Sequence, residues 1–236
     1  MARTSRSQEF LLSRRVIGGL IVLGVILPIV GVIVVAVRGD LRGLTAGFQG
    51  VGGIGDRASA LATVTLFAIP GLILLLVGFS LFTLLLWDAG DRGISIVAFT
   101  LWFGALILAM IEGTFQASVT VWAGNARTGS VPELFEPLRL WMNMWVQRFY
   151  VPMGLVAAAA YGWAILETRL LPRWVGWGSI GSSVAWLAVF RLDGEAIPAV
   201  IFVVPLVIGI VLVIQRKPVA LPEETPPSRQ ASQPPH

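Results

Sequence analysis

The feature that most constrains this chain is a series of long apolar segments separated by short polar connections. One of them, Ile94–Ala123, reads ISIVAFTLWFGALILAMIEGTFQASVTVWA and contains a single charged residue, Glu112. At about 1.5 Å per residue, a helix of this length exceeds the roughly 30 Å hydrocarbon core of a bilayer. Composition agrees, because only 13% of the residues are charged, against about a quarter in soluble proteins. The sequence therefore predicts an all-α integral membrane protein.

We predict a bundle of six transmembrane helices. The expected spans cover about residues 16–37, 61–87, 94–123, 149–166, 175–190 and 197–214. A basic segment, 1–15, precedes them, and a tail rich in Pro, Ser, Gln and Glu, 215–236, follows and is expected to be disordered. The first apolar run is longer than the 7–15 residues of a signal-peptide core, so we expect an uncleaved first span.

The distribution of basic residues predicts that both termini lie in the cytoplasm. In this orientation ten basic residues lie in inner segments and seven in outer segments, as the positive-inside rule requires. The inner set is Arg3, Arg6, Arg14, Arg15, Arg92, Arg169, Arg173, Arg216, Lys217 and Arg229. We therefore expect a multi-pass protein of the cell membrane, either a bacterial inner membrane or a plasma membrane. The basic residues form no continuous stripe, so we expect no nucleic-acid partner.

The candidate functional site is Glu112, with Gln116 one helical turn later on the same face. A carboxylate within an apolar span is costly and is therefore a functional hypothesis by default. Three interpretations of Glu112 stay open. It could be a protonated, purely structural hydrogen-bonding group, a proton or cation relay in a transporter, or a group near the outer headgroups if the span is shifted along the membrane normal.

Three connections contain patterns that need interpretation. The glycine-rich connection Arg38–Ser59 includes G-x-G-x-x-G at Gly50–Gly55, but it lacks the strand, the βαβ unit and the acidic residue of a dinucleotide site, so we predict a flexible loop. The turn Asp88–Gly93 supplies too few oxygens for a hard cation, and we predict a solvated turn. The segment Leu138–Phe149 has apolar residues at helical spacing. It fits either an interfacial amphipathic helix or the first turns of the fourth span.

Small residues mark two expected packing faces. The fourth span contains the run Ala157–Ala160 and Gly162, and the fifth contains Gly176, Gly178, Gly181, Ser182 and Ser183. Small side chains let membrane helices approach closely, so we expect each face to pack against another helix.

The side-chain inventory excludes several kinds of chemistry. Cysteine is absent, the single histidine is His236 in the tail, and the single lysine is Lys217 beyond the last span. Thiol nucleophiles, histidine-ligated haem or zinc, and a Schiff base inside the bundle are therefore unsupported. We assign no catalytic residue, no metal ligand and no cofactor, and enzymes are the least favoured class.

The connection between the fourth and fifth spans reads ETRLLPRWVGW. Its residues Leu171, Pro172, Arg173, Trp174 and Gly176 form the pattern Leu-Pro-Arg-Trp-x-Gly. This turn resembles one in a family of uncharacterised bacterial multi-pass integral membrane proteins, where a glycine opens the next span. The resemblance implies a helical fold of six to seven spans and offers no activity. Independently of it, Pro172 suits the start of a helix.

Two functional hypotheses follow. The first is a small transporter or channel-like protein in which Glu112 and Gln116 bind a proton, a cation or a polar substrate. The second is a non-catalytic membrane subunit or scaffold, which binds a partner protein or lipid through the small-residue faces and the segment Leu138–Phe149. The expected partners are the lipid bilayer and either another membrane protein or a second copy of the chain.

Overall fold

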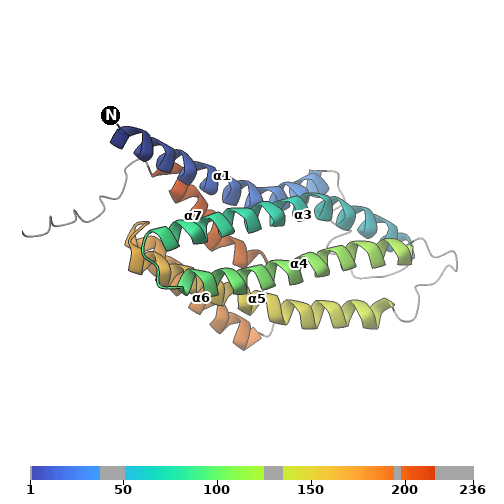
Figure 1. The fold of residues 1–236 in the computed structure, drawn as a ribbon. Helices are drawn as coiled ribbons and strands as arrows, with labels where there is room; N and C mark the ends of the chain where they lie inside the picture. Colours follow the sequence, from blue (N-terminus) through green and yellow to red (C-terminus); the bar gives the residue numbers. More distant parts are fainter. Residues whose placement is uncertain (1, 38–50, 125–134, 194–197, 216–236) are drawn as a thin grey trace, which may run out of the picture.

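The computed structural model describes residues 2–37, 51–124, 135–193 and 198–215. All regular elements within these ranges are helices (Figure 1), which confirms the all-α prediction for the described part of the chain. They are α1 (Ala2–Val37), α3 (Val51–Asp88), α4 (Ile94–Gly124), α5 (Phe135–Thr168), α6 (Arg173–Asp193), the 3-10 helix η1 (Pro198–Phe202) and α7 (Val203–Ile214).

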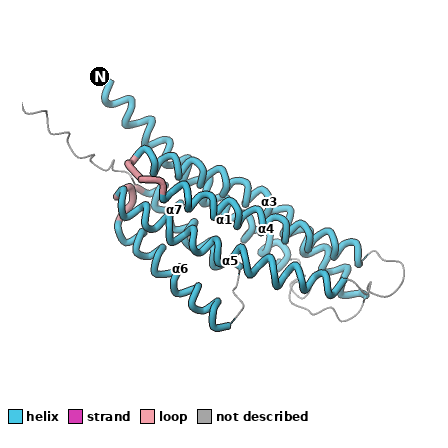
Figure 2. Tube along the Cα trace, turned by 60° about the horizontal axis from the view of Figure 1, so that its bottom comes forward, coloured by secondary structure: helices cyan, strands magenta, loops and turns pink. Residues whose placement is uncertain are grey.

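Helices that follow one another in the chain pack side by side. The principal contacts join α1 to α3, α3 to α4, α4 to α5 and α5 to α6, and α7 packs back on α1. Figure 2 shows the same bundle turned, with the long helices running in roughly one direction. The contacts between α1 and α7 therefore bring together the first and the last of the described α-helices.

Four helices are long and apolar enough to cross a membrane. The candidate spans are Arg14–Val34, Ala62–Asp88, Ile94–Phe115 and Arg148–Thr168. The last two predicted spans correspond to helices, α6 and α7, that are not among them. Glycine and serine dilute the apolar character of α6, and α7 is only about 18 Å long, well short of a bilayer core. Each of the six predicted spans therefore corresponds to a described α-helix, but only four of these six helices are long and apolar enough to cross a membrane.

Helices α3 and α5 begin earlier than the apolar segments that define them, as α1 does at Ala2. Helix α3 starts at Val51, so the predicted flexible loop is wrong for residues 51–59, while residues 38–50 lie outside the described ranges. A helix extends readily once it is nucleated, which lets it continue past the apolar run. Helix α5 starts at Phe135 and continues through Leu138–Phe149 into the span. The segment therefore forms one continuous helix with the fourth predicted span, and the candidate membrane-crossing part of that helix begins at Arg148.

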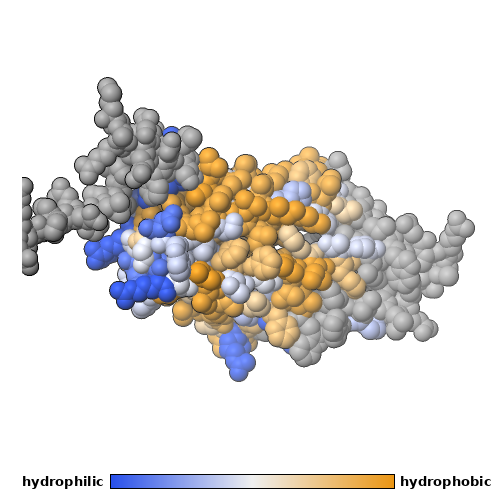
Figure 3. All heavy atoms as spheres, in the orientation of Figure 1, coloured by the Kyte–Doolittle hydropathy of each residue, from blue (hydrophilic) through white to orange (hydrophobic). Residues whose placement is uncertain are grey.

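On the face shown in Figure 3, the described surface is mostly apolar along the bundle, and hydrophilic residues gather at one end. The hydrophilic end contains the α3–α4 and α5–α6 turns (pink in Figure 2). Large apolar side chains such as Leu23, Leu66 and Ile111 are at least half exposed along the sides. A soluble protein rarely exposes so much contiguous apolar surface, which agrees with a location in lipid.

Glycines allow three close helix crossings. A Cβ atom added at Gly24 of α1 would lie 2.8 Å from the carbonyl oxygen of Gly71 in α3. The corresponding distance is 2.7 Å between Gly162 of α5 and Gly176 of α6, so the predicted packing role of these two glycines is confirmed. Close backbone approach is a common way for membrane helices to associate.

The third glycine crossing joins Gly18 of α1 to Gly209 of α7. A Cβ atom added at Gly18 would lie 2.7 Å from the Gly209 carbonyl oxygen. In contrast, Gly178 and Gly181 of α6 have no heavy atom within 4 Å of such a Cβ. The prediction that these two residues pack against another helix is therefore wrong within the chain, because α6 turns that face away from the bundle.

Candidate functional site

Helix α4 places Glu112 in an apolar span at its contact with α5. The side chain of Glu112 is half-buried, and its carboxylate accepts a hydrogen bond from the hydroxyl of Tyr150 on α5. Tyr150 is only 4% exposed. A hydrogen bond to an ionised group is stronger than one between neutral groups, and in a dry environment it offsets part of the cost of burial. The pair therefore joins two candidate spans through polar groups.

A third helix contributes a polar group at the same level. Thr65 of α3 donates a hydrogen bond of 3.4 Å to the backbone carbonyl of Gly113, the residue after Glu112. A Cβ atom added at Gly113 would have no heavy atom within 4 Å. Helices α3, α4 and α5 thus supply polar atoms around Glu112, and the backbone beside it is not tightly packed.

The depth of Glu112 follows from the helix geometry. It is about 27 Å along α4 from the first residue of that helix, and Tyr150 is about the same distance along α5 from Thr168. Both measures start at the hydrophilic end of the bundle (Figure 3). In a hydrocarbon core roughly 30 Å thick, the pair would lie near the opposite boundary. This geometry favours the interpretation in which Glu112 lies near the headgroups.

The other polar residues of the candidate region divide into two groups. Gln116 is on α4, but its side chain lies outside what the structure describes, so its predicted role with Glu112 stays a prediction. Thr114 and Ser118 are exposed and donate hydrogen bonds to carbonyls of their own helix, Thr114 to Met110 over 2.7 Å and Ser118 to Thr114. Hydroxyls bonded in this way are already satisfied and need no further partner.

Sequence reasoning missed Tyr150. The chain has only two tyrosines among its many aromatic residues, and both lie buried on α5 with a hydrogen-bond partner on another helix. A buried tyrosine hydroxyl needs such a partner. The rarity of tyrosine was the available signal, but the sequence does not show which partner each residue meets.

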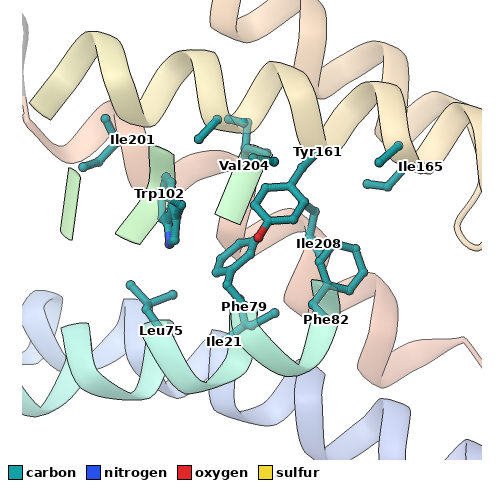
Figure 4. Close-up of a cluster of buried hydrophobic side chains, with 14 of the residues drawn as sticks. Ile21, Leu75, Phe79, Phe82, Trp102, Tyr161, Ile165, Ile201, Val204 and Ile208 are labelled. Atoms are coloured by element: carbon teal, nitrogen blue, oxygen red, sulfur yellow. The ribbon is translucent and has the colours of Figure 1, made fainter. Parts of the chain in front are cut away.

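The second tyrosine, Tyr161, lies in the aromatic centre of the bundle (Figure 4). Its hydroxyl and that of Thr83 on α3 are 2.8 Å apart, and Thr83 donates a further bond of 2.8 Å to the carbonyl of Phe79. The ring centroid of Phe79 lies 5.0 Å from that of Tyr161 and 5.1 Å from that of Trp102. These distances suit favourable aromatic pairs, and they leave a closely packed centre.

The turn between α3 and α4 differs from the predicted solvated turn. Asp91 is 6% exposed, and its Oδ2 atom accepts hydrogen bonds from the Gly93 and Ser95 backbone N–H groups and, over 2.6 Å, from the Ser95 hydroxyl. A carboxylate in this position satisfies free N–H groups at the start of α4 and interacts favourably with the helix dipole. Gly90 and Gly93 adopt positive φ angles of 98° and 104°, which the tight turn requires. Asp91 is therefore a helix-capping residue.

Among the described residues, no group of three His, Cys, Asp or Glu side chains is placed to hold a metal ion. The chain matches no protein-family model, and no similar protein was found among curated sequences or solved structures. Functional conclusions therefore depend on the geometry of the chain itself.

Proposed function

We propose that the chain is a small transporter or channel-like protein of the cell membrane, in which Glu112 binds a proton or a cation. In this proposal the six helical segments form one membrane-embedded bundle with both termini in the cytoplasm. Glu112 then lies at the outer boundary of the membrane. The observation that supports the proposal most strongly is the pair of Glu112 and Tyr150, which connects two apolar spans through an ionisable group.

A structural role alone accounts less well for this pair. A neutral side chain would join α4 to α5 without the cost of placing a carboxylate against apolar surroundings. A carboxylate at the membrane boundary can exchange a proton or a cation with water, and the Tyr150 hydroxyl can hold it in one orientation. Gly113 leaves space beside it. The aromatic centre around Tyr161 (Figure 4) is then a closed barrier deeper in the bundle.

Proton flux into liposomes tests this proposal. The purified chain is reconstituted with a pH-sensitive dye inside, and a potassium gradient with valinomycin sets the membrane potential. We expect flux above that of empty liposomes, and at least a tenfold reduction in Glu112→Gln, which keeps the shape but cannot ionise. Asp88→Asn is the matched control, because Asp88 is an exposed acid at the other end of the bundle.

The Asp88→Asn variant should conduct like the wild type. A well-folded Glu112→Gln protein with wild-type flux would contradict the proton proposal. The same assay with sodium or potassium gradients and a cation-sensitive dye extends the test to cations. Absence of any flux from the wild-type chain in both assays would contradict the transporter class as a whole.

A second candidate function, a membrane subunit or scaffold, is supported by the outer face of α6. Gly178, Gly181 and Ala185 are exposed at helical spacing, and the two glycines have open space beside them. Small residues at this spacing are typical of helix–helix interfaces in membranes. The other predicted small-residue face contains Ala158, which is 3% exposed and already packed inside the bundle. Of the two predicted small-residue faces, that of α6 is therefore the one available to a partner.

Crosslinking and affinity purification from the native membrane test the scaffold function. We expect a stoichiometric partner, or a second copy, that is lost in Gly181→Leu. Gly19→Leu is the control, because Gly19 on α1 also has open space around it. A partner retained in Gly181→Leu would exclude this face as the binding site.

A further inference from the structure

A second site lies at the hydrophilic end of the bundle, remote from Glu112. An open hollow of about 590 Å³ is lined by Arg92, Ile94, Trp163, Leu166, Glu167 and Trp177. These residues come from the α3–α4 turn, the start of α4, the last turns of α5 and the start of α6. The hollow therefore opens where the turns of the bundle meet the apolar sides.

Opposite charges lie together at this hollow. A guanidinium nitrogen of Arg92 is 3.8 Å from a carboxylate oxygen of Glu167, and the Arg92 side chain is 89% exposed. This distance exceeds that of a hydrogen bond, and an exposed ion pair adds little stability, so both groups can turn to a ligand at small cost. A ligand that contains one anionic and one cationic group would match them.

One apolar residue of the hollow, Trp163, lies farther from the hydrophilic end of the bundle than the charged pair does. Trp163 is one helical turn before Glu167, about 6 Å farther along α5 toward the apolar middle of the bundle. Trp163 and Trp177 are 56% and 63% exposed, and exposed tryptophans are typical of the headgroup region of membranes. Leu166 and Ile94 complete the apolar lining. The hollow thus combines a charged pair with apolar side chains, as a phospholipid combines a charged headgroup with acyl chains.

We propose that this hollow binds one molecule of phosphatidylethanolamine. The phosphate pairs with Arg92, and the primary ammonium group donates hydrogen bonds to Glu167. The indole faces of Trp163 and Trp177 flank the ammonium group and the upper acyl chains. Charge-assisted hydrogen bonds and cation–π contacts supply the recognition. The proposal requires a membrane location but not transport, because no group of the hollow contacts Glu112 or Tyr150.

Native mass spectrometry of the full chain in detergent tests the site. Phosphatidylethanolamine and phosphatidylglycerol with identical acyl chains are added in separate titrations. We expect one bound phosphatidylethanolamine, with an affinity about tenfold above that of phosphatidylglycerol, since only the former offers an ammonium group to Glu167. Water-soluble glycerophosphoethanolamine distinguishes the lipid from its headgroup, and should compete weakly because it lacks acyl chains.

Variants then assign the preference to the hollow. Glu167→Gln should lower the ratio of the two affinities to about one, and Trp163→Ala should weaken both lipids by several-fold. Asp88→Asn and Trp174→Ala are matched controls at the same end of the bundle, exposed but outside the hollow, and should change neither value. The ratio in Glu167→Gln is independent of the fraction of folded protein. Equal binding of the two lipids by the wild type, or a wild-type ratio in Glu167→Gln, would overturn the proposal.

Discussion

Tyr150 and Tyr161 lie on the same helix, are both almost fully buried, and both use their hydroxyls to join α5 to another helix. Their partners differ. Tyr161 meets the hydroxyl of Thr83 within a packed aromatic cluster, whereas Tyr150 meets the ionisable carboxyl group of Glu112. The comparison shows that burial alone does not separate a structural residue from a candidate functional one. The chemical nature of the partner does.

The largest effect on stability is expected from the removal of the Tyr161 side chain. Tyr161→Ala leaves a cavity between Phe79 and Phe82, whose ring centroids lie 5.0 Å and 5.7 Å from that of Tyr161. We expect a loss of about 3–5 kcal/mol in the free energy of unfolding, as for other buried aromatic residues. Denaturation in detergent, followed by circular dichroism, measures it. The control Phe149→Ala removes an exposed aromatic residue of the same helix and should cost far less; equal losses would show that the centre is not the main source of stability.

An intermediate effect, on flux rather than on stability, is expected at Tyr150. Tyr150→Phe removes the hydrogen bond to Glu112 and keeps the ring, so we expect proton flux in liposomes to fall about tenfold, the equivalent of one charge-assisted hydrogen bond. Tyr161→Phe in the same assay should leave flux within twofold of the wild type. If both substitutions reduced flux equally, the functional distinction between the two tyrosines would fail.

The smallest effect is expected from removal of the Tyr161 hydroxyl alone. In Tyr161→Phe the Thr83 hydroxyl keeps its bond to the Phe79 carbonyl, so no buried donor is left without a partner. We expect a loss of about 1 kcal/mol in the free energy of unfolding. Thr83→Val should cost more, about 1–3 kcal/mol, because it leaves the buried Tyr161 hydroxyl without its partner. The double variant should cost less than the two single losses together, because the two hydroxyls share one bond. Full additivity in this double-mutant cycle would show that the two hydroxyls do not interact.

The helical class, and the segments that form the helices, could be predicted from the sequence because they depend on long apolar runs. The ends of the helices could not. Helices α3 and α5 extend beyond their apolar segments at Val51 and Phe135, since backbone hydrogen bonding continues where hydropathy no longer gives a signal. The outward glycine face of α6 depends on which helices pack around it, and hydropathy does not record that.

One residue of the candidate site could be predicted from the sequence, and its partner could not. Glu112 stands out as a lone carboxylate in an apolar run. Its partner Tyr150 lies on another helix and has no unusual sequence context. Asp91 was expected to be solvated, but three hydrogen bonds hold it as a buried cap, because the two glycines of the turn let the chain fold back onto its carboxylate. Contacts between side chains of different helices can be identified only once the positions of the helices relative to one another are known.

The close contact between Gly18 and Gly209 has a consequence for biosynthesis. These residues belong to the first and last α-helices described, so the surface of α1 that receives α7 has no intramolecular partner while the helices between them are being made. At usual rates of translation this interval lasts roughly 10–40 seconds. During that time the glycine face of α1 that receives α7 is exposed to its surroundings. Ribosome-bound chains that stop before Gly209 would display this face, and α7 completes the contact by displacing whatever covers it.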